Sequence, residues 1–369
     1  MMRVAIITEL AFPDSGGQSV RYRELGSYLV RQGHAVDVFT IRHHQDLPVE
    51  ESVDGVRIFR CVTSIPYIKY RWPGRSISGI LSFACSMRRR VARMGREYDI
   101  LLFNQWPLFH VLMAHTARDY RILVDWCEIR SDPIMQLLQR ALVKKGDMHI
   151  CVSEGVRDQL LANYGADGAR TVVLESGIFF NKYRIHSRGQ RENPALIFVG
   201  RLVRHKRVDL AIEAFRRVLE LCPRARFTIT GDGPLRGKLM EQYKDLVSGG
   251  QLVFTGFVDE STKIDLYAAS DFFVITSERE GFPRVVAEAM ASGVPVITTG
   301  CEGNGTADVV RRNGVGVISR HNADDVAKSL VDLWWNPNGY EAVAAACRRY
   351  AASLDWSVIC ARLLEMRSA

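Results

Sequence analysis

Two glutamates, Glu280 and Glu288, frame the segment of the sequence with the clearest chemical pattern. The segment directly follows an apolar strand predicted at 272–276, and it reads Glu-Gly-Phe-Pro-Arg-Val-Val-Ala-Glu. Its proline suits the first turn of a helix, so the N–H groups of 282–286 should lie unpaired at a helix start, where phosphate or a sugar oxygen binds. Glu280 would lie just ahead of this turn and Glu288 roughly 7 Å further along the helix axis. The two carboxylates could therefore bind neighbouring hydroxyls of one elongated ligand. An acidic first turn with one solvated glutamate is the alternative.

Two further loops offer contacts for an anionic ligand. Arg201 and Lys206 follow the strand predicted at 195–199. Arginine suits a bidentate hydrogen-bonded contact with a phosphate, and lysine suits a contact as a single point charge. Gly16 and Gly17 follow the first predicted strand and would let the backbone approach a ligand closely. Neither loop matches the Walker or the Gly-x-Gly-x-x-Gly pattern, and a merely solvated basic loop is the alternative for the first.

Short apolar strands alternate with helical patterns over most of the chain, which predicts parallel sheets covered by helices on both faces. The expected strands are 4–8, 35–40, 100–103, 122–125, 148–152, 171–174, 195–199, 227–230, 252–255, 272–276 and 294–298. We therefore expect two doubly wound α/β domains in tandem, with the ligand in the cleft at the carboxyl ends of the strands. The expected boundaries are 1–180 for the N-terminal domain, 181–193 for a basic linker, 194–354 for the C-terminal domain and 355–369 for a terminal helix.

Length and composition are those of a globular protein. The 369 residues suffice for two domains, and 47% hydrophobic with 24% charged residues excludes disorder, collagen and coiled coil. No apolar run approaches the ~20 residues of a bilayer span, and no signal-peptide pattern is present. The eight cysteines are scattered without a Cys-x-x-Cys pair, which favours reduced thiols over disulfides or structural zinc. We expect a cytoplasmic protein whose net charge of +8 favours an anionic partner.

A basic stretch lies between Pro66 and Arg96, where no acidic residue occurs. Its eight basic residues are Lys69, Arg71, Arg75, Arg88, Arg89, Arg90, Arg93 and Arg96. Aromatic and apolar side chains alternate with them, a combination that suits a lipid headgroup surface or an anionic acceptor. A solvated helix face over an ordinary core is the alternative. Nucleic acid would fit the charge, but no recognised binding motif supports it.

The order of these motifs resembles that of the retaining glycosyltransferases of family 4. Their fold, GT-B, has two Rossmann-like domains facing across a cleft, and the resemblance covers nearly the whole chain. The matching motifs are Gly16-Gly17, Gly200-Arg201 with Lys206, Gly231-Asp232-Gly233-Pro234, Phe254 to Val258, Ser270-Asp271, Glu280 to Glu288 and Ala289 to Val296.

The resemblance implies a role for each candidate residue. Arg201 and Lys206 would hold the nucleotide diphosphate, Glu280 would bind hydroxyls of the donor sugar, and Glu288 would bind the ribose. The other implied donor contacts are Gly17 at the diphosphate, Phe257 and Val258 beside the base, and Phe282, Pro283, Arg284 and Val285 at the helix start. The last helix, around Trp356, would return to the N-terminal domain. No cofactor and no metal are implied, because cations and a helix start can stabilise the departing diphosphate.

One position departs from the family pattern. Many relatives have a histidine after the strand predicted at 122–125, and Cys127 stands there in this chain. Acceptor-side candidates are therefore Gly16, Asp125 and Glu128. A buried aspartate that anchors its own loop is the alternative for Asp125.

We expect a hexosyltransferase that moves a sugar from a nucleotide-diphosphate sugar to an acceptor hydroxyl with retention of configuration. A UDP-sugar is favoured over a GDP-sugar, and the acceptor is expected to be lipid-linked or a saccharide in cell-envelope polysaccharide or glycolipid assembly. The enzyme would be cytoplasmic or peripheral at the inner face of the membrane. The alternatives are a small natural product as acceptor, or an epimerase or phosphorylase of the same fold. A non-catalytic basic binder is disfavoured by the intact set of charged motif residues.

Overall fold

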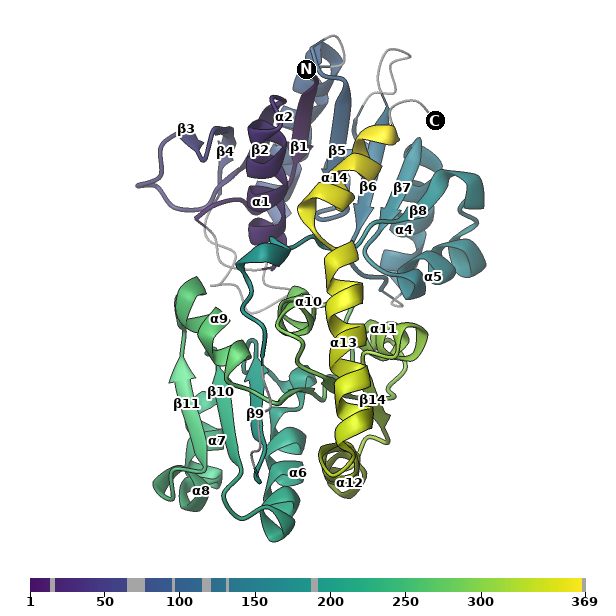
Figure 1. Cartoon of the computed structure of the whole chain (residues 1–369). Coiled ribbons are helices and arrows are strands. Elements are labelled where there is room, and N and C mark those ends of the chain that lie inside the picture. Colours follow the sequence, from purple (N-terminus) through teal and green to yellow (C-terminus); the bar gives the residue numbers. More distant parts are fainter. Residues whose placement is uncertain are drawn as a thin grey trace. The chain divides into compact units, whose positions relative to one another are not determined.

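The computed structural model describes residues 1–13, 17–64, 77–94, 97–114, 121–130, 133–186 and 192–366. The chain divides into two compact units. The first unit consists of Met1–Gly177 and the segment from Trp356 onward, and the second consists of Ile178–Asp355. Each unit is built around one sheet with helices on both faces (Figure 1).

The first unit contains an eight-stranded sheet in the order β3-β4-β2-β1-β5-β6-β7-β8. Its strands are β1 (Arg3–Ile7), β2 (Ala35–Arg42), β3 (Glu50–Val53), β4 (Val56–Thr63), β5 (Ile100–Asn104), β6 (Ile122–Trp126), β7 (Met148–Cys151) and β8 (Thr171–Val173). All neighbouring strands are parallel except β3 and β4, which form a hairpin at the edge. The other six strands were expected from the sequence to within two residues at each end, whereas the strands of this hairpin were not expected.

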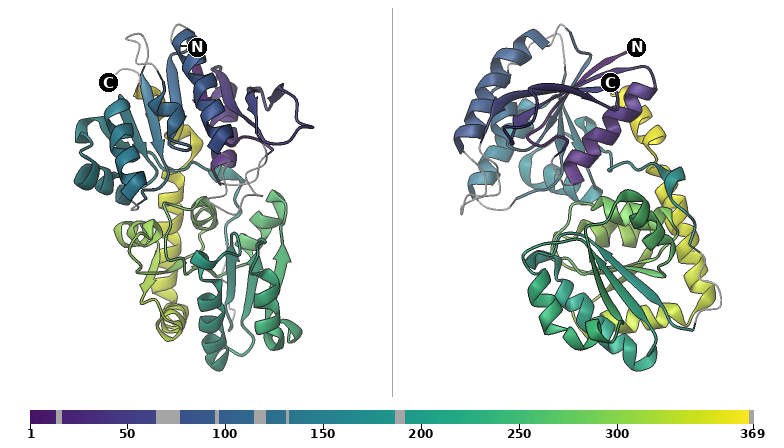
Figure 2. Two further views of the ribbon diagram at one scale, coloured as in Figure 1. Left: turned by 180° about the vertical axis from the view of Figure 1, so that it is seen from behind. Right: turned by 90° about the vertical axis from the view of Figure 1, so that its left-hand side faces the viewer.

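The helices of the first unit are α1 (Gly17–Arg31), α2 (Ile77–Met94), α3 (Phe109–Leu112), α4 (Pro133–Lys145), α5 (Glu154–Tyr164) and α14 (Trp356–Glu365). One face of the sheet packs against α2 and α4 through buried side chains such as Ile7, Phe103 and Met87. The opposite face carries α1, with α14 beside it (Figure 2). Alternate side chains of a strand point to opposite faces, so both faces are buried and the strands are apolar throughout.

The terminal helix α14 is fixed to the first unit by Trp356. Its indole Nε1 donates a hydrogen bond to Glu24 of α1 at 2.8 Å, and the ring is 1% exposed. A Cβ at Gly177 would lie 2.4 Å from the indole ring, so only glycine leaves room for this packing. The segment from Trp356 onward therefore belongs to the first unit although it follows the second in sequence.

The second unit contains a six-stranded, wholly parallel sheet in the order β11-β10-β9-β12-β13-β14. Its strands are β9 (Ala195–Val199), β10 (Arg226–Thr230), β11 (Leu252–Gly256), β12 (Phe272–Ile275), β13 (Val296–Thr299) and β14 (Gly316–Ser319). Its helices are α6 (Val208–Leu221), α7 (Arg236–Gln242), α8 (Lys244–Ser248), α9 (Glu260–Ala268), α10 (Arg284–Ala291), α11 (Gly305–Asn313), α12 (Ala323–Trp334) and α13 (Pro337–Ser353). Strand β14 was not among the strands expected from the sequence.

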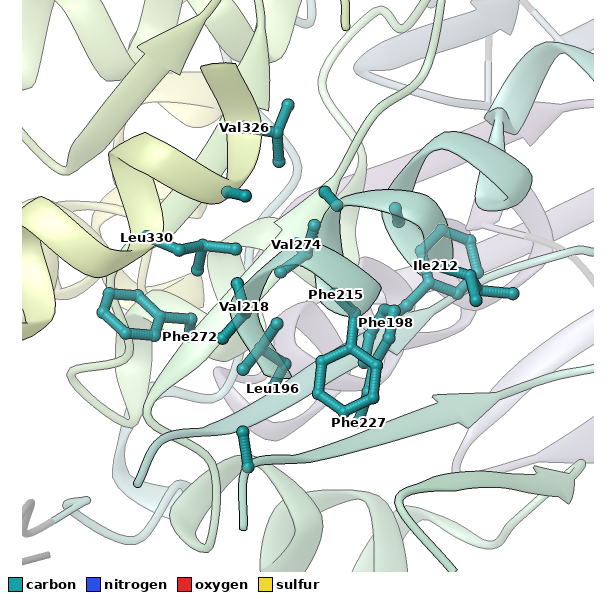
Figure 3. Packing of buried hydrophobic residues seen from close by; sticks show 14 of the residues in the cluster. Leu196, Phe198, Ile212, Phe215, Val218, Phe227, Phe272, Val274, Val326 and Leu330 are labelled. Atoms are coloured by element: carbon teal, nitrogen blue, oxygen red, sulfur yellow. The ribbon is translucent and has the colours of Figure 1, made fainter. Parts of the chain in front are cut away.

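The core of the second unit lies on both faces of its sheet. On one face Phe198 and Phe227 pack against Phe215 of α6 and Leu330 of α12, as Figure 3 shows. On the other face the buried side chains of α10 and α13 cover the sheet, with Val286 fully buried. These two layers hold the strands rigidly, so the loops at the strand ends have a fixed base.

The described residues of the segment expected as a linker at 181–193 pack against the second unit. Tyr183 is 6% exposed and lies in the core of the second unit, and the His186 N–H donates to the Ser292 carbonyl at 2.7 Å. Lys182 and Arg184 pair with Glu260 and Asp265 of α9. Two of the basic residues that indicated a linker thus have acidic partners far along the sequence, and the other two, Arg188 and Arg191, lie outside the described residues.

Candidate active site

Five loops meet at the carboxyl edge of the second sheet, because parallel strands all end on the same side. They are 200–206 after β9, 231–234 after β10, 257–259 after β11, 276–283 after β12 and 300–304 after β13. This edge is the usual ligand site of an open parallel sheet. The motif residues expected to contact the donor, other than Gly17, lie in these loops or in the helix that follows β12.

Lys206 and Glu280 form an ion pair at this edge. Their side chains are only 17% and 10% exposed, so solvent screens the pair weakly. The backbone of Glu280 is also fixed, since its N–H donates to Gly303 at 3.0 Å and its carbonyl accepts from Gly305 at 2.8 Å. The sequence predicted both residues as site members, and the structure brings them into contact.

Arg201 adds positive charge next to this pair. Its side chain is exposed and forms no hydrogen bond or ion pair within the described ranges of the chain. Burial lowers the pKa of His205, and the cations Lys206, Arg279 and Arg201 lower it further, against the opposing charge of Glu280. The loop is therefore a concentration of positive charge that a phosphate group would neutralise.

Two glycines allow the loops to pack this closely. A Cβ at Gly231, where φ is +124°, would lie 2.1 Å from the Gly200 carbonyl oxygen. A Cβ at Gly305 would lie 1.8 Å from the Gly281 carbonyl oxygen. The backbone next to Arg201 and the backbone next to Glu280 are thus both held by contacts that no other residue type allows.

The proline of the motif, expected in the first turn of the helix, lies just before helix α10. Pro283 occupies the N-cap position with an extended ψ of 126°, and the first helical residue is Arg284. The Val286 N–H already donates to the Pro283 carbonyl at 2.9 Å, so Val286 is not one of the unpaired donors expected over 282–286. Phe282 is 7% exposed and packs edge-on against Tyr350, so its ring serves the core. The Phe282 ring is therefore not available to a ligand, whereas Val285 is half-buried at the start of α10.

Glu288 lies deeper than Glu280, inside a set of hydrogen-bond donors. Its carboxylate accepts from the Tyr267 hydroxyl at 3.0 Å and from Arg284 Nε at 2.9 Å, and it pairs with Lys263 Nζ at 2.8 Å. The side chain is 2% exposed. Burial alone would raise the pKa of Glu288, but the charges of Lys263 and Arg284 outweigh it and keep the pKa below its usual range. Lys263 and Tyr267 were not predicted as site residues.

The loop after β11 presents an aromatic side chain to solvent. Phe257 is 75% exposed, whereas the neighbouring Val258 is half-buried. An exposed phenylalanine at the ligand edge of a sheet offers a flat apolar surface on which a nucleobase could stack. Phe257 and Val258 thus lie at the same sheet edge as the charged candidates.

In the first unit, Asp125 at the end of β6 is fully buried. It forms an ion pair with Arg21 at 3.2 Å and accepts a hydrogen bond from the Tyr22 hydroxyl at 2.8 Å. The Asn104 side chain in turn donates to the Tyr22 hydroxyl at 2.9 Å. Asp125 therefore ties α1 to β6, whereas the alternative considered from the sequence was that it anchors its own loop.

Glu128 is the more accessible acceptor-side candidate. Its side chain is 44% exposed and pairs with Arg130 at 3.1 Å. The buried Gln105 fixes the loop below it, because its amide oxygen accepts from Cys127 N–H at 2.6 Å and its amide nitrogen donates to the Glu128 carbonyl at 2.7 Å. Gln105 was missed by the sequence reasoning, since a single glutamine after a strand carries no recognisable signal. Gly16 lies outside the described residues, whereas Gly17 begins α1, and a Cβ added there would meet no described atom within 4 Å.

The described residues contain neither a cluster of metal-binding side chains nor a helix able to span a membrane. No three or more histidine, cysteine, aspartate or glutamate side chains lie together in a way that could hold a metal ion. Across the described ranges, none of the helices has both the length and the apolar character needed to cross a bilayer.

Two family models match the chain between residues 15 and 351. The model described as Glycosyltransferase Family 4 matches residues 15–180, and the model described as Glycosyl transferases group 1 matches residues 180–351. These matches and the two parallel-sheet units define a glycosyltransferase with the GT-B fold. The chain belongs to the family 4 glycosyltransferases, which confirms the resemblance and the fold class predicted from the sequence.

Individual relatives agree with this assignment. The alpha-monoglucosyldiacylglycerol synthase of Streptococcus pneumoniae is 28% identical over 323 residues, which are 81% of this chain and 71% of the relative. Sucrose-phosphate synthase from Thermosynechococcus elongatus has a similar structure, with a TM-score of 0.81, 19% identity and coverage of 99% of this chain and 98% of that one. The Anabaena HepE protein in complex with UDP and glucose has a TM-score of 0.74 at 18% identity, covering 100% of both chains. At these identities the two structures show a shared fold.

Proposed function

We propose that this glycosyltransferase moves a sugar from a nucleotide-diphosphate sugar to an acceptor hydroxyl with retention of configuration. The observation that carries the proposal is the weakly screened ion pair of Lys206 and Glu280 beside the exposed Arg201. The two cations suit a diphosphate, and the carboxylate suits sugar hydroxyls. A nucleotide-diphosphate sugar contains both of these groups, a diphosphate and a sugar joined directly to it.

The roles of the three residues follow from their chemistry. Lys206 carries three N–H donors, so it can hold Glu280 and still donate to phosphate oxygens. Arg201 can bind two phosphate oxygens at once. As the bond between sugar and phosphate breaks, negative charge grows on the diphosphate, and cations fixed in advance stabilise that charge most in the transition state. Glu280 would orient the sugar through its hydroxyls.

We also propose that the transfer needs no metal ion, because the cations of the 200–206 loop would supply the charge that a metal supplies elsewhere. Activity is therefore expected to survive treatment with a strong chelator. Loss of activity that magnesium or manganese restores would refute metal independence and leave the donor assignment standing.

A uridine nucleotide is the proposed carrier of the sugar. HepE, which shares the fold, was solved in complex with UDP and glucose. In this chain the exposed Phe257 would lie beside the base. For the acceptor we propose a lipid-linked molecule or a saccharide of a cell-envelope polysaccharide or glycolipid. The name of the Streptococcus pneumoniae relative, alpha-monoglucosyldiacylglycerol synthase, supports a lipid acceptor.

A lipid acceptor requires access to a membrane surface, and we propose that the first unit provides it at the cytoplasmic face. Arg88, Arg89 and Arg93 are exposed on α2, and these three guanidinium groups form no ion pair within the described ranges of the chain. Helix α4 covers the same face of the sheet and exposes Ile134 and Leu137, at 70% and 71%. Cations and large apolar side chains on one layer suit a bilayer that contains anionic lipid.

Slow hydrolysis of the donor in the absence of acceptor tests the proposed reaction without knowledge of the acceptor. A panel of UDP- and GDP-sugars is incubated with the enzyme, and release of the nucleoside diphosphate is measured. We expect one nucleotide-sugar to be hydrolysed and Glu280→Gln to reduce that rate far more than it reduces affinity for the bare nucleoside diphosphate. Hydrolysis of no member, together with no binding of UDP or GDP, would overturn the proposal.

A further inference from the structure

Cys301 contacts a histidine at the carboxyl edge of the second sheet. It lies in the loop after β13, and its Sγ is 3.1 Å from Nδ1 of His321, in the loop after β14. The same Nδ1 lies 2.9 Å from Thr299 Oγ1, and this oxygen lies 3.8 Å from the Cys301 Sγ. Cys301 and His321 are both half-buried. A thiol in contact with an imidazole is the arrangement that activates cysteine as a nucleophile.

Arg207, the residue before α6, determines which nitrogen of His321 carries the proton. One guanidinium nitrogen of Arg207 lies 3.1 Å from His321 Nε2. Because a guanidinium group has only donors, Nε2 must accept, and the proton of a neutral ring is on Nδ1. Burial lowers the pKa of His321, and the charge of Arg207 lowers it further, so the ring is neutral near pH 7. The Nδ1–H is therefore shared between Thr299 Oγ1 and Cys301 Sγ.

These contacts stabilise the thiolate of Cys301 more than the thiol. The protonated Nδ1 of His321 cannot accept the S–H proton, but it can donate to a negatively charged sulfur. The Thr299 hydroxyl can donate to the sulfur as well. Hydrogen bonds to the charged form of a group favour that form, and the thiolate is the form that attacks oxidants.

The other seven cysteines are also free, but they differ in their surroundings. Four of them are buried. Burial raises the pKa of the half-buried Cys61 to about 11 and that of the half-buried Cys127 to about 12. Cys85 is exposed on α2. Exposure alone therefore predicts that an oxidant reacts first at Cys85, whereas activation by His321 predicts that it reacts first at Cys301.

The turn that contains Cys301 also holds the backbone of Glu280. The Cys301 carbonyl accepts from the Asn304 N–H at 3.1 Å, and the Gly303 carbonyl accepts from the Glu280 N–H at 3.0 Å. Glu280 and Asn304 also pair as an isolated β-bridge. A group added to the half-buried sulfur needs space next to His321, so the turn has to shift, and the Glu280 backbone shifts with it.

We propose that Cys301 is a redox-sensitive thiol, activated by His321 and oxidised by peroxide, and that its oxidation lowers turnover by shifting the turn that holds Glu280. Only the effect on turnover rests on the proposed function. The thiolate sulfur attacks one peroxide oxygen, so that an S–O bond forms and the O–O bond breaks. The leaving hydroxide takes a proton from the solvent and becomes water. Sulfur is oxidised by two electrons and the peroxide is reduced by two, which gives a sulfenic acid.

A small thiol reverses this oxidation in two steps. The first thiol molecule forms an S–S bond with Cys301 and releases the sulfenic oxygen as water. A second thiol molecule attacks this mixed disulfide, which frees the Cys301 thiol and releases the small molecule as its own disulfide.

Dimedone labelling during exposure to hydrogen peroxide, measured for each cysteine by mass spectrometry, tests the reactivity of the thiol. We expect Cys301 to be labelled about tenfold faster than the more exposed Cys85, because reaction rate follows thiolate character. His321→Leu should slow labelling of Cys301 about tenfold and leave the rate at Cys85 unchanged. His321→Asn should recover part of the rate, since the asparagine amide N–H can take the place of Nδ1–H.

Hydrolysis of the donor before and after peroxide treatment tests the effect on turnover. Peroxide should reduce the rate of the wild type and of the control Cys85→Ser several-fold, and dithiothreitol should restore both rates. Cys301→Ser should start near the rate of the wild type and should not respond to peroxide, because it lacks the sulfur.

The other outcomes are distinguishable. Labelling of Cys85 as fast as Cys301 would overturn the inference, and so would an unchanged rate at Cys301 in His321→Leu. If His321→Leu does not fold, the ratio of the two rates in the wild type decides. Labelling of Cys301 without loss of hydrolysis would overturn the effect on Glu280. A wild type that hydrolyses no nucleotide-sugar and binds neither UDP nor GDP overturns the donor proposal, whereas the labelling rates still decide on the thiol.

Discussion

Lys206 and Glu280 form an ion pair that joins the loops after two neighbouring strands, β9 and β12. Because both side chains are largely buried, loss of either partner leaves a poorly solvated charge behind. Arg201, in contrast, is exposed. The two cations proposed to bind the diphosphate therefore differ in what they contribute to stability.

This difference gives a first prediction. Arg201→Ala and Lys206→Ala should each weaken UDP binding by about 1.5–3 kcal/mol, the usual range for hydrogen bonds to charged groups. Only Lys206→Ala should also lower the free energy of unfolding, because Glu280 loses its partner. Calorimetric titration measures the UDP affinity, and chemical denaturation measures the free energy of unfolding. Lys238→Ala, which removes an exposed cation on α7, is the control. Unchanged UDP affinity in both variants would contradict the assignment of the diphosphate site.

A second prediction concerns the packing of Gly305 against Gly281. In Gly305→Ala the new methyl group would meet a backbone carbonyl at 1.8 Å, so the 280–281 backbone must shift. We expect a loss of about 1–3 kcal/mol of stability, as for overpacked cores, and reduced turnover because Glu280 moves.

The matched control is Gly237→Ala on α7, where a Cβ meets no atom within 4 Å. Alanine favours a helix over glycine, so this variant should be as stable as the wild type or up to about 1 kcal/mol more stable. Equal stability and equal turnover of the two variants would show that the Gly305 contact does not position Glu280.

The third prediction concerns acid stability of the first unit. His149 is buried, accepts a hydrogen bond from Trp126 Nε1 at 3.1 Å, and lies 3.1 Å from the Val143 carbonyl through Nε2. These partners fit the neutral ring with its proton on Nε2. Burial is the main reason that the pKa of His149 falls from 6.5 to about 4.

Between about pH 6.5 and about pH 4, His149 binds a proton in the unfolded chain but not in the folded chain. The free energy of unfolding therefore falls as the pH drops through this range. The shift corresponds to roughly 3 kcal/mol for this one group, all of it present above pH 6.5. His149→Gln should be less stable at neutral pH but should lose less stability between pH 6.5 and 4. Urea denaturation at several pH values measures this slope, and equal slopes for both proteins would contradict the prediction.

The sequence predicted those features that depend on neighbouring residues. Continuous apolar runs such as 195–199 became strands as expected, and the order of the charged motifs located the carboxyl edge of the second sheet. The β3–β4 hairpin had a signal that was not used, because Asp54 and Gly55 form its turn with φ values of 53° and 81°. An Asp-Gly pair favours such a two-residue turn, but the polar sequence of β3, Glu-Glu-Ser-Val, gives no strand signal of its own.

The site features that were not predicted depend on contacts between residues that are distant in the sequence. Arg21 pairs with Asp125, which lies 104 positions away, and the sequence alone does not show that both are buried. Lys263 and Glu288 come from different helices, and only the packing of α9 against α10 brings them together. The same holds for Gln105, whose partners at 127 and 128 lie on the next strand's loop. A local pattern carries no information about such pairs.

The last prediction concerns the basic stretch, of which Lys69, Arg71, Arg75 and Arg96 lie outside the described residues. Arg88, Arg89 and Arg93 are described and exposed on α2. If α2 docks on anionic lipid, each arginine contributes about 1 kcal/mol, and this attraction decays within a Debye length of ~8 Å at physiological salt. Reversal of all three to glutamate should therefore nearly abolish binding to anionic vesicles, and added salt should weaken binding of the wild type.

The control reverses three exposed arginines of the second unit, Arg217, Arg224 and Arg320, which changes the net charge equally. This control should keep most of its vesicle binding if α2 forms the docking surface. The α2 variant should keep its UDP affinity, because the proposed nucleotide site belongs to the second unit. Co-sedimentation with vesicles of increasing anionic content, at low and high salt, measures the binding. A wild type that stays in the supernatant even at low salt would refute membrane docking and favour an acceptor that is free in solution, since the arginines would then only be hydrated.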